Sequence, residues 1–337
     1  MNLLAAGHAT SMTVAEQWLF GVFLSIVVIF LVIDLGFFDK NPHKVSTRSA
    51  LYQSLLWVSI SVAFGLCIYY FDDPDLSLEF FSAYLTEKAL SVDNIFVIVL
   101  IFRYFKVDEK LYHLVLVWGI LGAIVMRAIF IYLGALLIEQ FHAVLYVFGA
   151  FLLYTGIKML LHKERDEEEL NAESNPILRL ARRYLPFVNQ YHGKAFRIKK
   201  NGKWFFTPLF LVVLLIESTD LIFAVDSIPA VFGVSQNTFV IYTSNIFAIL
   251  GLRAMFFLLA GVLDKFYLLQ RGLSLVLIFI GLKMLAEVPF LNIHIDIVYS
   301  LGFIIVVLGG AIGLSLLFPK KPTTGAAEPH TLRSPDS

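Results

Sequence analysis

The chain has 337 residues, of which 58% are hydrophobic and only 15% charged, and its formal net charge is zero. A water-soluble protein of this length cannot bury so large an apolar fraction, so the composition excludes an ordinary soluble domain and indicates a polytopic membrane protein. The zero net charge also argues against nucleic acid as a partner, because such a partner attracts strongly basic chains.

Apolar runs long enough to cross a bilayer recur along the chain. No Lys or Arg precedes Lys40, so the first run lacks the basic start of a signal peptide and is expected to be retained. The predicted fold class is an all-α membrane protein with one transmembrane domain over residues 1–320. We expect about nine transmembrane helices, at residues 17–35, 49–70, 81–103, 111–138, 143–162, 206–232, 239–262, 268–288 and 295–318.

Lysine and arginine fall in alternate loops. Basic residues occur at 36–48, 103–110, 163–205 and 263–271 and in the C-terminal tail, whereas the loops at 72–79, 139–142, 234–237 and 289–294 have none. Because cytoplasmic loops are enriched in basic residues, this pattern predicts an N-terminus outside and a C-terminus in the cytoplasm.

The 163–205 segment is the one sizeable piece that we expect outside the membrane, as a cytoplasmic loop. It begins with the run KERDEEEL, typical of a solvated helix, and Asn201-Gly202 lies between alternating residues, which predicts a two-residue β-hairpin turn. The tail at 321–337 has the composition of a disordered segment. The sequence leaves open whether the loop binds a protein partner and whether the chain forms a homodimer.

The two halves of the chain share three landmarks in the same order. VDNI at 92–95 matches VDSI at 225–228, MRAIF at 126–130 matches LRAMF at 252–256, and GIKML at 156–160 matches GLKML at 281–285. Each copy holds three spans, so the second copy must enter the membrane from the opposite side. The sequence therefore predicts an inverted repeat of the third to fifth and sixth to eighth helices, an arrangement common in secondary transporters, whose sites lie at the repeat interface.

Acidic residues inside these spans are the main functional signal. An ionised acid in a membrane helix costs roughly 2.5–3.5 kcal/mol, so five of them need compensation. Two arginines placed at mid-depth by the repeat, Arg127 and Arg253, would offset only part of the negative charge. Protons or a bound cation must meet the rest. The five acids are Glu87, Asp93, Glu217, Asp220 and Asp226.

The neighbouring donors are all oxygens. The amide Asn94 and the hydroxyls of Ser91, Ser218, Thr219 and Ser227 lie close in sequence to the acids. Oxygen-only sets suit Mg²⁺, Ca²⁺ or Mn²⁺ and argue against Zn²⁺ and copper, but they do not choose among the three.

Helix geometry limits how these acids can share one site. Residues six apart, such as Glu87 and Asp93, are about 120° apart around a helix and about 9 Å apart along it. Either the helices unwind there, or the mid-depth Asp binds the cation while the acid six residues before it serves as a gate or proton carrier. Pro229 favours a local break in the second copy and frees the Val225 carbonyl.

Three further polar residues have alternative roles. Glu217 has no acidic counterpart in the first copy and suits an access path. Asp34 could be a sixth donor or an interfacial residue at a helix end. Asn245 could join the site or hydrogen-bond between helices.

Four stretches also carry a family resemblance: EKALSVDNIF, RYLPFVNQYHG with AFRIKKNGKWFFTPLF, IESTDLIFAVDSIPAVF and IYTSNIFAILGLRAMFFLL. They resemble the TerC family of integral membrane proteins, and the sequence of the 163–205 loop most resembles the Alx-like branch of that family. The resemblance implies a bacterial inner-membrane protein linked to manganese export, ion homeostasis and, by name, tellurium (tellurite) resistance, with some members tied to alkaline pH. It also implies that Glu87, Asp93, Glu217, Asp220 and Asp226 carry metal.

Three functions remain in competition at this stage. The leading hypothesis is a secondary Mn²⁺ exporter, not an enzyme, in which Mn²⁺ binds between Asp93 and Asp226 with Asn94 and a freed carbonyl, and protons reload the acids. Ca²⁺ is not excluded as a substrate, and no ATP-binding motif is present. The alternatives are a non-transporting membrane factor for insertion or metalation of other proteins, with a structural metal, and an intramembrane aspartyl protease. No GxGD sequence surrounds either Asp, which argues against the protease.

Overall fold

The computed structural model describes residues 13–37, 47–141, 143–161, 179, 183–188, 190–200, 202–260, 267–286 and 295–318. Within the helices, the side chains of residues 33–37, 47 and 93 are not described. The predicted acidic helix after residue 163 and the predicted disordered tail therefore lie outside the described residues, as do the side chains of Asp34 and Asp93.

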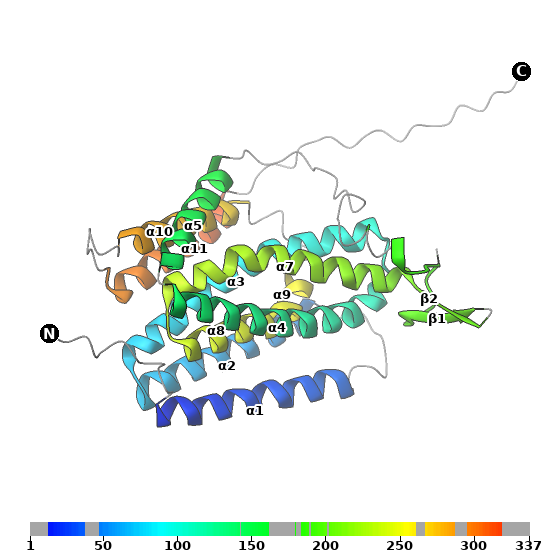
Figure 1. Ribbon diagram of the computed structural model, residues 1–337, viewed down its shortest axis with the longest axis horizontal. Helices are drawn as coiled ribbons and strands as arrows, with labels where there is room; N and C mark the ends of the chain where they lie inside the picture. Colours follow the sequence, from blue (N-terminus) through cyan, green and yellow to red (C-terminus); the bar gives the residue numbers. More distant parts are fainter. Residues whose placement is uncertain are drawn as a thin grey trace, which may run out of the picture.

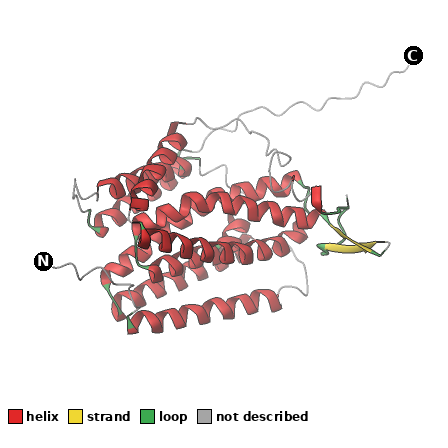
Figure 2. Ribbon diagram, viewed as in Figure 1, coloured by secondary structure: helices red, strands yellow, loops and turns green. Residues whose placement is uncertain are grey.

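The described part of the chain is almost entirely helical (Figure 2). The helices are α1 (Val14–Phe37), α2 (Thr47–Phe71), α3 (Pro74–Tyr104), α4 (Glu109–Gln140), α5 (Ala143–Leu161), α7 (Pro208–Val234), α8 (Thr238–Leu250), α9 (Leu252–Leu259), α10 (Leu269–Ala286) and α11 (Ile297–Leu317). Helices α8 and α9 form one membrane-length segment, so the described residues contain nine such segments, in agreement with the predicted spans.

Eight of the nine segments are long and apolar enough to cross a membrane. The ninth is α3, which has 31 residues but carries Glu87, Lys88 and Asp93 in its central part. Its start is well defined, because Pro74 occupies the first turn and the Asp73 side chain accepts a hydrogen bond from the Asp75 backbone N–H. The helix that is least suited to lipid thus carries two of the five predicted acids, Glu87 and Asp93.

Helix α3 lies near the centre of the bundle (Figure 1). It packs against α2, α7, α8 and α11, and α4 packs in turn against α7 and α8. Helices α5, α10 and α11 lie together towards the end of the bundle opposite the β-hairpin. The two central helices, α3 and α7, are therefore shielded from lipid by other helices along much of their length.

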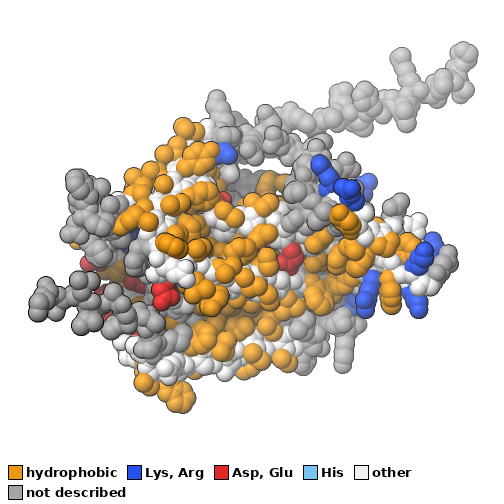
Figure 3. All heavy atoms as spheres, viewed as in Figure 1, with side chains coloured by type: hydrophobic (Ala, Val, Ile, Leu, Met, Phe, Trp, Pro, Cys, Tyr) orange, Lys and Arg blue, Asp and Glu red, His pale blue; other side chains and the backbone are white. Residues whose placement is uncertain are grey.

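Large apolar side chains cover much of the outer surface (Figure 3). Helix α1, for example, exposes Trp18, Val28 and Val32, and α11 exposes Val306 and Leu317. An apolar surface of this kind is expected for helices that face acyl chains. The Lys and Arg side chains visible on this face gather mainly at the end that carries the hairpin.

The predicted hairpin is confirmed. Strands β1 (Arg197–Lys200) and β2 (Lys203–Phe206) pair antiparallel, with Lys200 opposite Lys203. Gly202 has a φ of 77°, which a two-residue turn needs and which glycine adopts without strain. The hairpin leads directly into α7 through Thr207, whose hydroxyl donates to the Ala195 carbonyl.

Two predicted helix details are corrected by the structure. The local break expected at Pro229 does not occur, because α7 runs without interruption from Pro208 to Val234 with Pro229 inside it. A break occurs instead within the predicted 239–262 span, at Gly251, where α8 ends and α9 begins. Surrounding helices can tolerate an internal proline without unwinding, and they can also stabilise an interruption that the hydrophobic pattern does not reveal.

Helices α5 and α10 pack through small residues. A Cβ on Gly281 would lie 2.7 Å from the Gly149 carbonyl oxygen, and a Cβ on Gly156 would lie 2.9 Å from the Ser274 carbonyl oxygen. The obstructing atoms belong to backbone that cannot rotate away. Close approach of this type is the usual way in which membrane helices associate without a hydrophobic driving force.

Candidate functional site: a buried charge cluster beside a polar cavity

Arg127 of α4 is the centre of a buried charge cluster. Its guanidinium forms an ion pair with the Glu87 carboxylate of α3 and donates to the Asn245 side-chain oxygen of α8 at 3.0 Å. Asp220 of α7 lies 3.9 Å from the same guanidinium. Four helices therefore each contribute one polar side chain to a single point inside the bundle, and the predicted pairing of Arg127 with the acids is present.

The cluster contains more acid than base. Glu87 and Arg127 are almost completely buried, so each charge is stabilised by the other and not by water. Asp220 is too far from the guanidinium for a hydrogen bond, which leaves its contact with Arg127 as a long ion pair. One arginine thus faces two carboxylates contributed by two different parts of the chain.

Asn94 extends the cluster along α3. Its side-chain N–H donates to the Asp220 carboxylate at 3.3 Å. The Asn94 amide oxygen and the second Asp220 carboxylate oxygen are both buried and have no hydrogen-bond partner. Buried acceptors without a donor cost free energy, and a bound cation or a proton would satisfy them.

A small cavity of about 50 Å³ opens beside these groups. Asn94, Arg127, Asp226 and Ser227 supply its polar lining, and the buried Ser227 hydroxyl also has no hydrogen-bond partner. Thr155 adds a further polar side chain, and Leu90, Met159, Phe223 and Leu277 complete the wall. The volume is roughly that of a cation with one or two waters. The cavity therefore brings together oxygen donors from α3 and α7, with Arg127 of α4 and Thr155 of α5 also in its wall.

The TerC integral membrane protein family matches residues 72–323, which include all of these groups. The chain belongs to the TerC family.

Relatives match over nearly their whole length. The chain is 42% identical over 316 residues to the membrane protein STKORF319 of Myxococcus xanthus, covering 94% of this chain and 97% of the relative. It is 44% identical over 306 residues to the protein of Escherichia coli K12 named "Putative membrane-bound redox modulator Alx", covering 88% of this chain and 93% of the relative. The Salmonella typhi protein of the same name is 45% identical over 306 residues. No solved structure matches the chain.

The remaining predicted residues of this TerC protein do not all join the cavity. The Ser91 hydroxyl donates to the Glu87 carbonyl of its own helix, and the Ser218 and Thr219 hydroxyls donate to Leu215 and Ile216 carbonyls in the same way. No group of three His, Cys, Asp or Glu side chains among the described residues is arranged to hold a metal ion directly. The Asp93 side chain is not among the described ones.

Glu217 and Arg253 lie away from the cavity. The Glu217 carboxylate packs against α4 at Gly122, where any Cβ would clash with it. Arg253 hydrogen-bonds to His113 at 3.1 Å and lies over the Phe30 ring. The backbone around Val225 remains helical, but Pro229 has no N–H, so the Val225 carbonyl still lacks the helical donor that residue 229 would otherwise supply.

Lys88 is a functional candidate that the sequence did not single out. Its ammonium donates to the Ala248 carbonyl at 2.9 Å and lies next to Gly251, where the helix is interrupted. The break at Gly251 deprives nearby carbonyls of the next helical turn, so Lys88 stabilises the interruption. In the sequence, the feature that could have identified Lys88 is its position next to Glu87 in an apolar helix.

Proposed function

We propose that this TerC protein is a secondary transporter that exports Mn²⁺ from the cytoplasm through the cavity between α3 and α7. The supporting observation is that Asp226, Asn94 and Ser227 line one buried cavity and that two of these three side chains carry oxygens without partners. Oxygen donors suit hard divalent cations. The choice of Mn²⁺ among them comes from the family resemblance, because the donors do not distinguish it from Ca²⁺ or Mg²⁺.

We infer that the cavity lies on the axis of an inverted repeat. The motifs VDNI and VDSI are 133 positions apart, so Leu90 corresponds to Phe223 and Asn94 to Ser227. Both corresponding pairs line the same cavity. A site built from equivalent residues of two halves is expected at the interface of an inverted repeat.

The packing of α5 against α10 supports the same axis. The motifs GIKML and GLKML are 125 positions apart, so Gly149 corresponds to Ser274 and Gly156 to Gly281. A two-fold axis turns the contact of Gly149 with Gly281 into a contact of Ser274 with Gly156. Both close approaches are present.

We propose an orientation with the hairpin in the cytoplasm. Exposed Arg197, Lys199, Lys200 and Lys203 lie on it, and basic residues favour the cytoplasmic side. The membrane would be the bacterial inner membrane, with the N-terminus outside. We further propose that protons are exchanged for Mn²⁺, because Glu87, Asp220 and Asp226 outnumber the arginine beside them.

The relatives' name concerns redox modulation. This chain has one cysteine, Cys67, so it cannot form a disulfide within itself. A redox role carried by a dithiol of this chain is therefore not proposed.

Uptake of labelled Mn²⁺ into inverted membrane vesicles tests the transport proposal. Asp226→Asn keeps the side-chain size but removes the charge that faces the cavity, so we expect uptake to fall to the level of vesicles without the protein. Glu139→Gln, at an exposed position near the end of α4, is the matched control and should transport normally. Equal uptake by wild type and Asp226→Asn contradicts the site. Binding of Mn²⁺ without any flux would favour the non-transporting membrane factor.

A further inference from the structure

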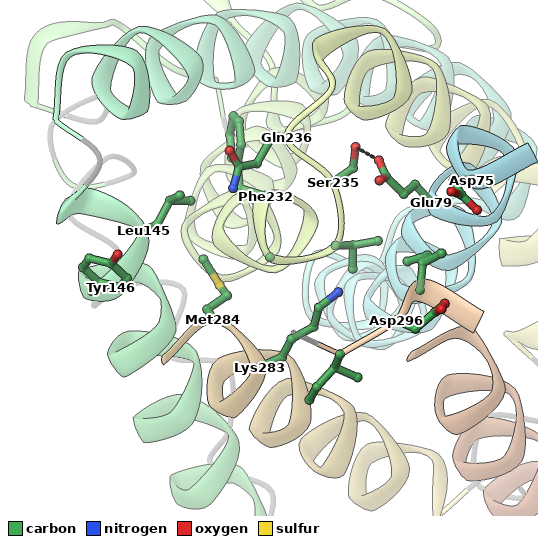
Figure 4. Close-up of a pocket in the computed structure, with 14 residues that line it drawn as sticks. Asp75, Glu79, Leu145, Tyr146, Phe232, Ser235, Gln236, Lys283, Met284 and Asp296 are labelled. Atoms are coloured by element: carbon green, nitrogen blue, oxygen red, sulfur yellow. Dashed lines mark hydrogen bonds between the residues drawn. The ribbon is translucent and has the colours of Figure 1, made fainter. Parts of the chain in front are cut away.

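A second, much larger pocket lies at the end of the bundle opposite the hairpin. It has a volume of about 810 Å³, and its polar lining comes from five segments: Asp75 and Glu79 of α3, Ser235 and Gln236 after α7, Lys283 of α10, and Asp296 before α11; Tyr146 of α5 also lines it (Figure 4). We call this the outer pocket. Its volume corresponds to roughly two dozen water molecules, so it can hold an ion with its hydration shell.

Lys283 is the unusual member of the outer pocket. Its side chain is only 8% exposed, and Figure 4 shows it extending into the pocket. Among the described residues its ammonium has no hydrogen bond and no ion pair, although it faces the Glu79 carboxylate closely enough to interact electrostatically. A lysine near a helix end is expected to extend towards water, and this one extends into the polar outer pocket, where three carboxylates also lie.

The outer pocket has more acidic than basic side chains in its lining. Three carboxylates, Asp75, Glu79 and Asp296, share the pocket with one ammonium. Ser235 donates to Glu79, which fixes that carboxylate at the pocket wall. The described acids are not close enough together to coordinate a bare metal ion. The lining therefore suits a hydrated cation, and the chain already places a tethered cation, the Lys283 ammonium, in this field.

The outer pocket and the cavity beside Asp226 lie along the same helices. On α7, Asp226 lines the cavity and Phe232 lines the outer pocket; on α10, Leu277 lines the cavity and Lys283 the outer pocket. Six residues of helix separate each pair, which is about 9 Å. Ile228, Phe232 and Ile280 belong to the packed core between the two spaces.

We propose that the outer pocket is a second binding site for a hydrated divalent cation, on the outward side of the transport site, in which the Lys283 ammonium competes with the ion. This proposal rests on the proposed function. The ammonium keeps the carboxylates partly neutralised while the outer pocket is empty. An arriving dication displaces it, and the returning ammonium weakens retention of the dication and promotes its release.

Mn²⁺ binding to the purified full-length protein in lipid nanodiscs tests the proposal, with titrations followed by the electron paramagnetic resonance of free Mn²⁺. Wild type should bind two ions per chain. Asp226→Asn should lose one of them and keep the other. Glu79→Gln or Asp296→Asn, added to Asp226→Asn, should remove the remaining ion, whereas Glu139→Gln, which does not line the pocket, should leave it unchanged.

Lys283→Met tests the role of the ammonium, because it keeps an unbranched side chain without the charge. In the Asp226→Asn background it should tighten the remaining Mn²⁺ binding on the order of tenfold, since one competing positive charge leaves the pocket. Unchanged or weaker binding would overturn the role of Lys283. If Asp226→Asn abolishes all binding, the outer site is wrong while the transport site stands. If wild type binds no Mn²⁺, both proposals fail.

Discussion

At the scale of single residues, Arg127 explains how acids from two parts of the chain coexist inside the membrane. Its guanidinium pairs with Glu87, lies 3.9 Å from Asp220 and donates to Asn245. The pairing is partial, because Asp220 and Asn94 keep buried oxygens without partners. A fully neutralised network would only fix helix packing. The oxygens left over make this network suitable for ion binding.

Replacing Arg127 by Gln should destabilise the protein severely. Breaking a buried ion pair by removing one partner costs about 3–5 kcal/mol, since the remaining carboxylate is left uncompensated. Thermal unfolding in detergent should show a large drop in Tm. The double variant Arg127→Gln with Glu87→Gln should recover part of the loss. A double variant no more stable than Arg127→Gln alone would contradict a direct pairing.

The sequence predicted the members of this cluster better than their partners. Glu87, Asp220 and Arg127 can be identified from the sequence, because a charged side chain in an apolar span costs free energy unless a partner or a ligand compensates it. The repeat, however, suggested equal roles for Arg127 and Arg253, and the structure gives Arg253 a contact with His113. Lys88 and Lys283 were not assigned to a site, because their roles depend on a helix break and on a pocket formed by five separate segments.

At the scale of elements, the interruption between α8 and α9 lies where the hydrophobic pattern of the sequence does not predict a helix break. Pro229 suggested an interruption of α7, yet the neighbouring helices keep α7 continuous. The interruption is at Gly251, between α8 and α9, and Lys88 donates to the Ala248 carbonyl there. Span positions follow from apolar length alone, whereas the location of a break depends on which carbonyl finds another donor.

Lys88→Met should therefore weaken the α8–α9 junction. The Ala248 carbonyl loses its side-chain donor, and an unsatisfied buried acceptor costs about 1–3 kcal/mol. Hydrogen exchange measured by mass spectrometry should show faster exchange around residues 248–255. Met retains the apolar length, so packing loss does not account for the effect. Exchange identical to wild type would show that the lysine does not support the break.

The contact between α5 and α10 offers a test of helix packing. Gly281→Ala places a Cβ 2.7 Å from the Gly149 carbonyl oxygen, so the helices must separate and the Tm should fall. Gly309→Ala in α11 is the matched control, since a Cβ there meets nothing within 4 Å. The control should be neutral or slightly stabilising, because alanine favours helix more than glycine does. Equal melting of both variants would argue against close packing at Gly281.

At the scale of the whole molecule, the proposed transport function requires one orientation. The Lys and Arg side chains visible in Figure 3 gather mainly at the hairpin end. The outer pocket is lined by residues at the start of α3 and the ends of α7 and α10, at the other end of the bundle. In a Cys67→Ser background, Lys199→Cys on the hairpin should react with a membrane-impermeant thiol reagent only in inverted vesicles. Gln236→Cys, at an exposed position after α7, should react in intact cells from which the outer membrane has been removed. The reverse labelling pattern would show the opposite orientation in the membrane and would contradict the proposed direction of transport.

The most direct test of the account is to locate the ion in an experimental structure of the protein with Mn²⁺ bound, by anomalous scattering at the manganese edge. We predict an anomalous peak between α3 and α7, within coordinating distance of the Asp226 carboxylate and next to Asn94 and Ser227, and no such peak in Asp226→Asn. A fully occupied Mn²⁺ position elsewhere, with this cavity empty or filled by side chains, would contradict it.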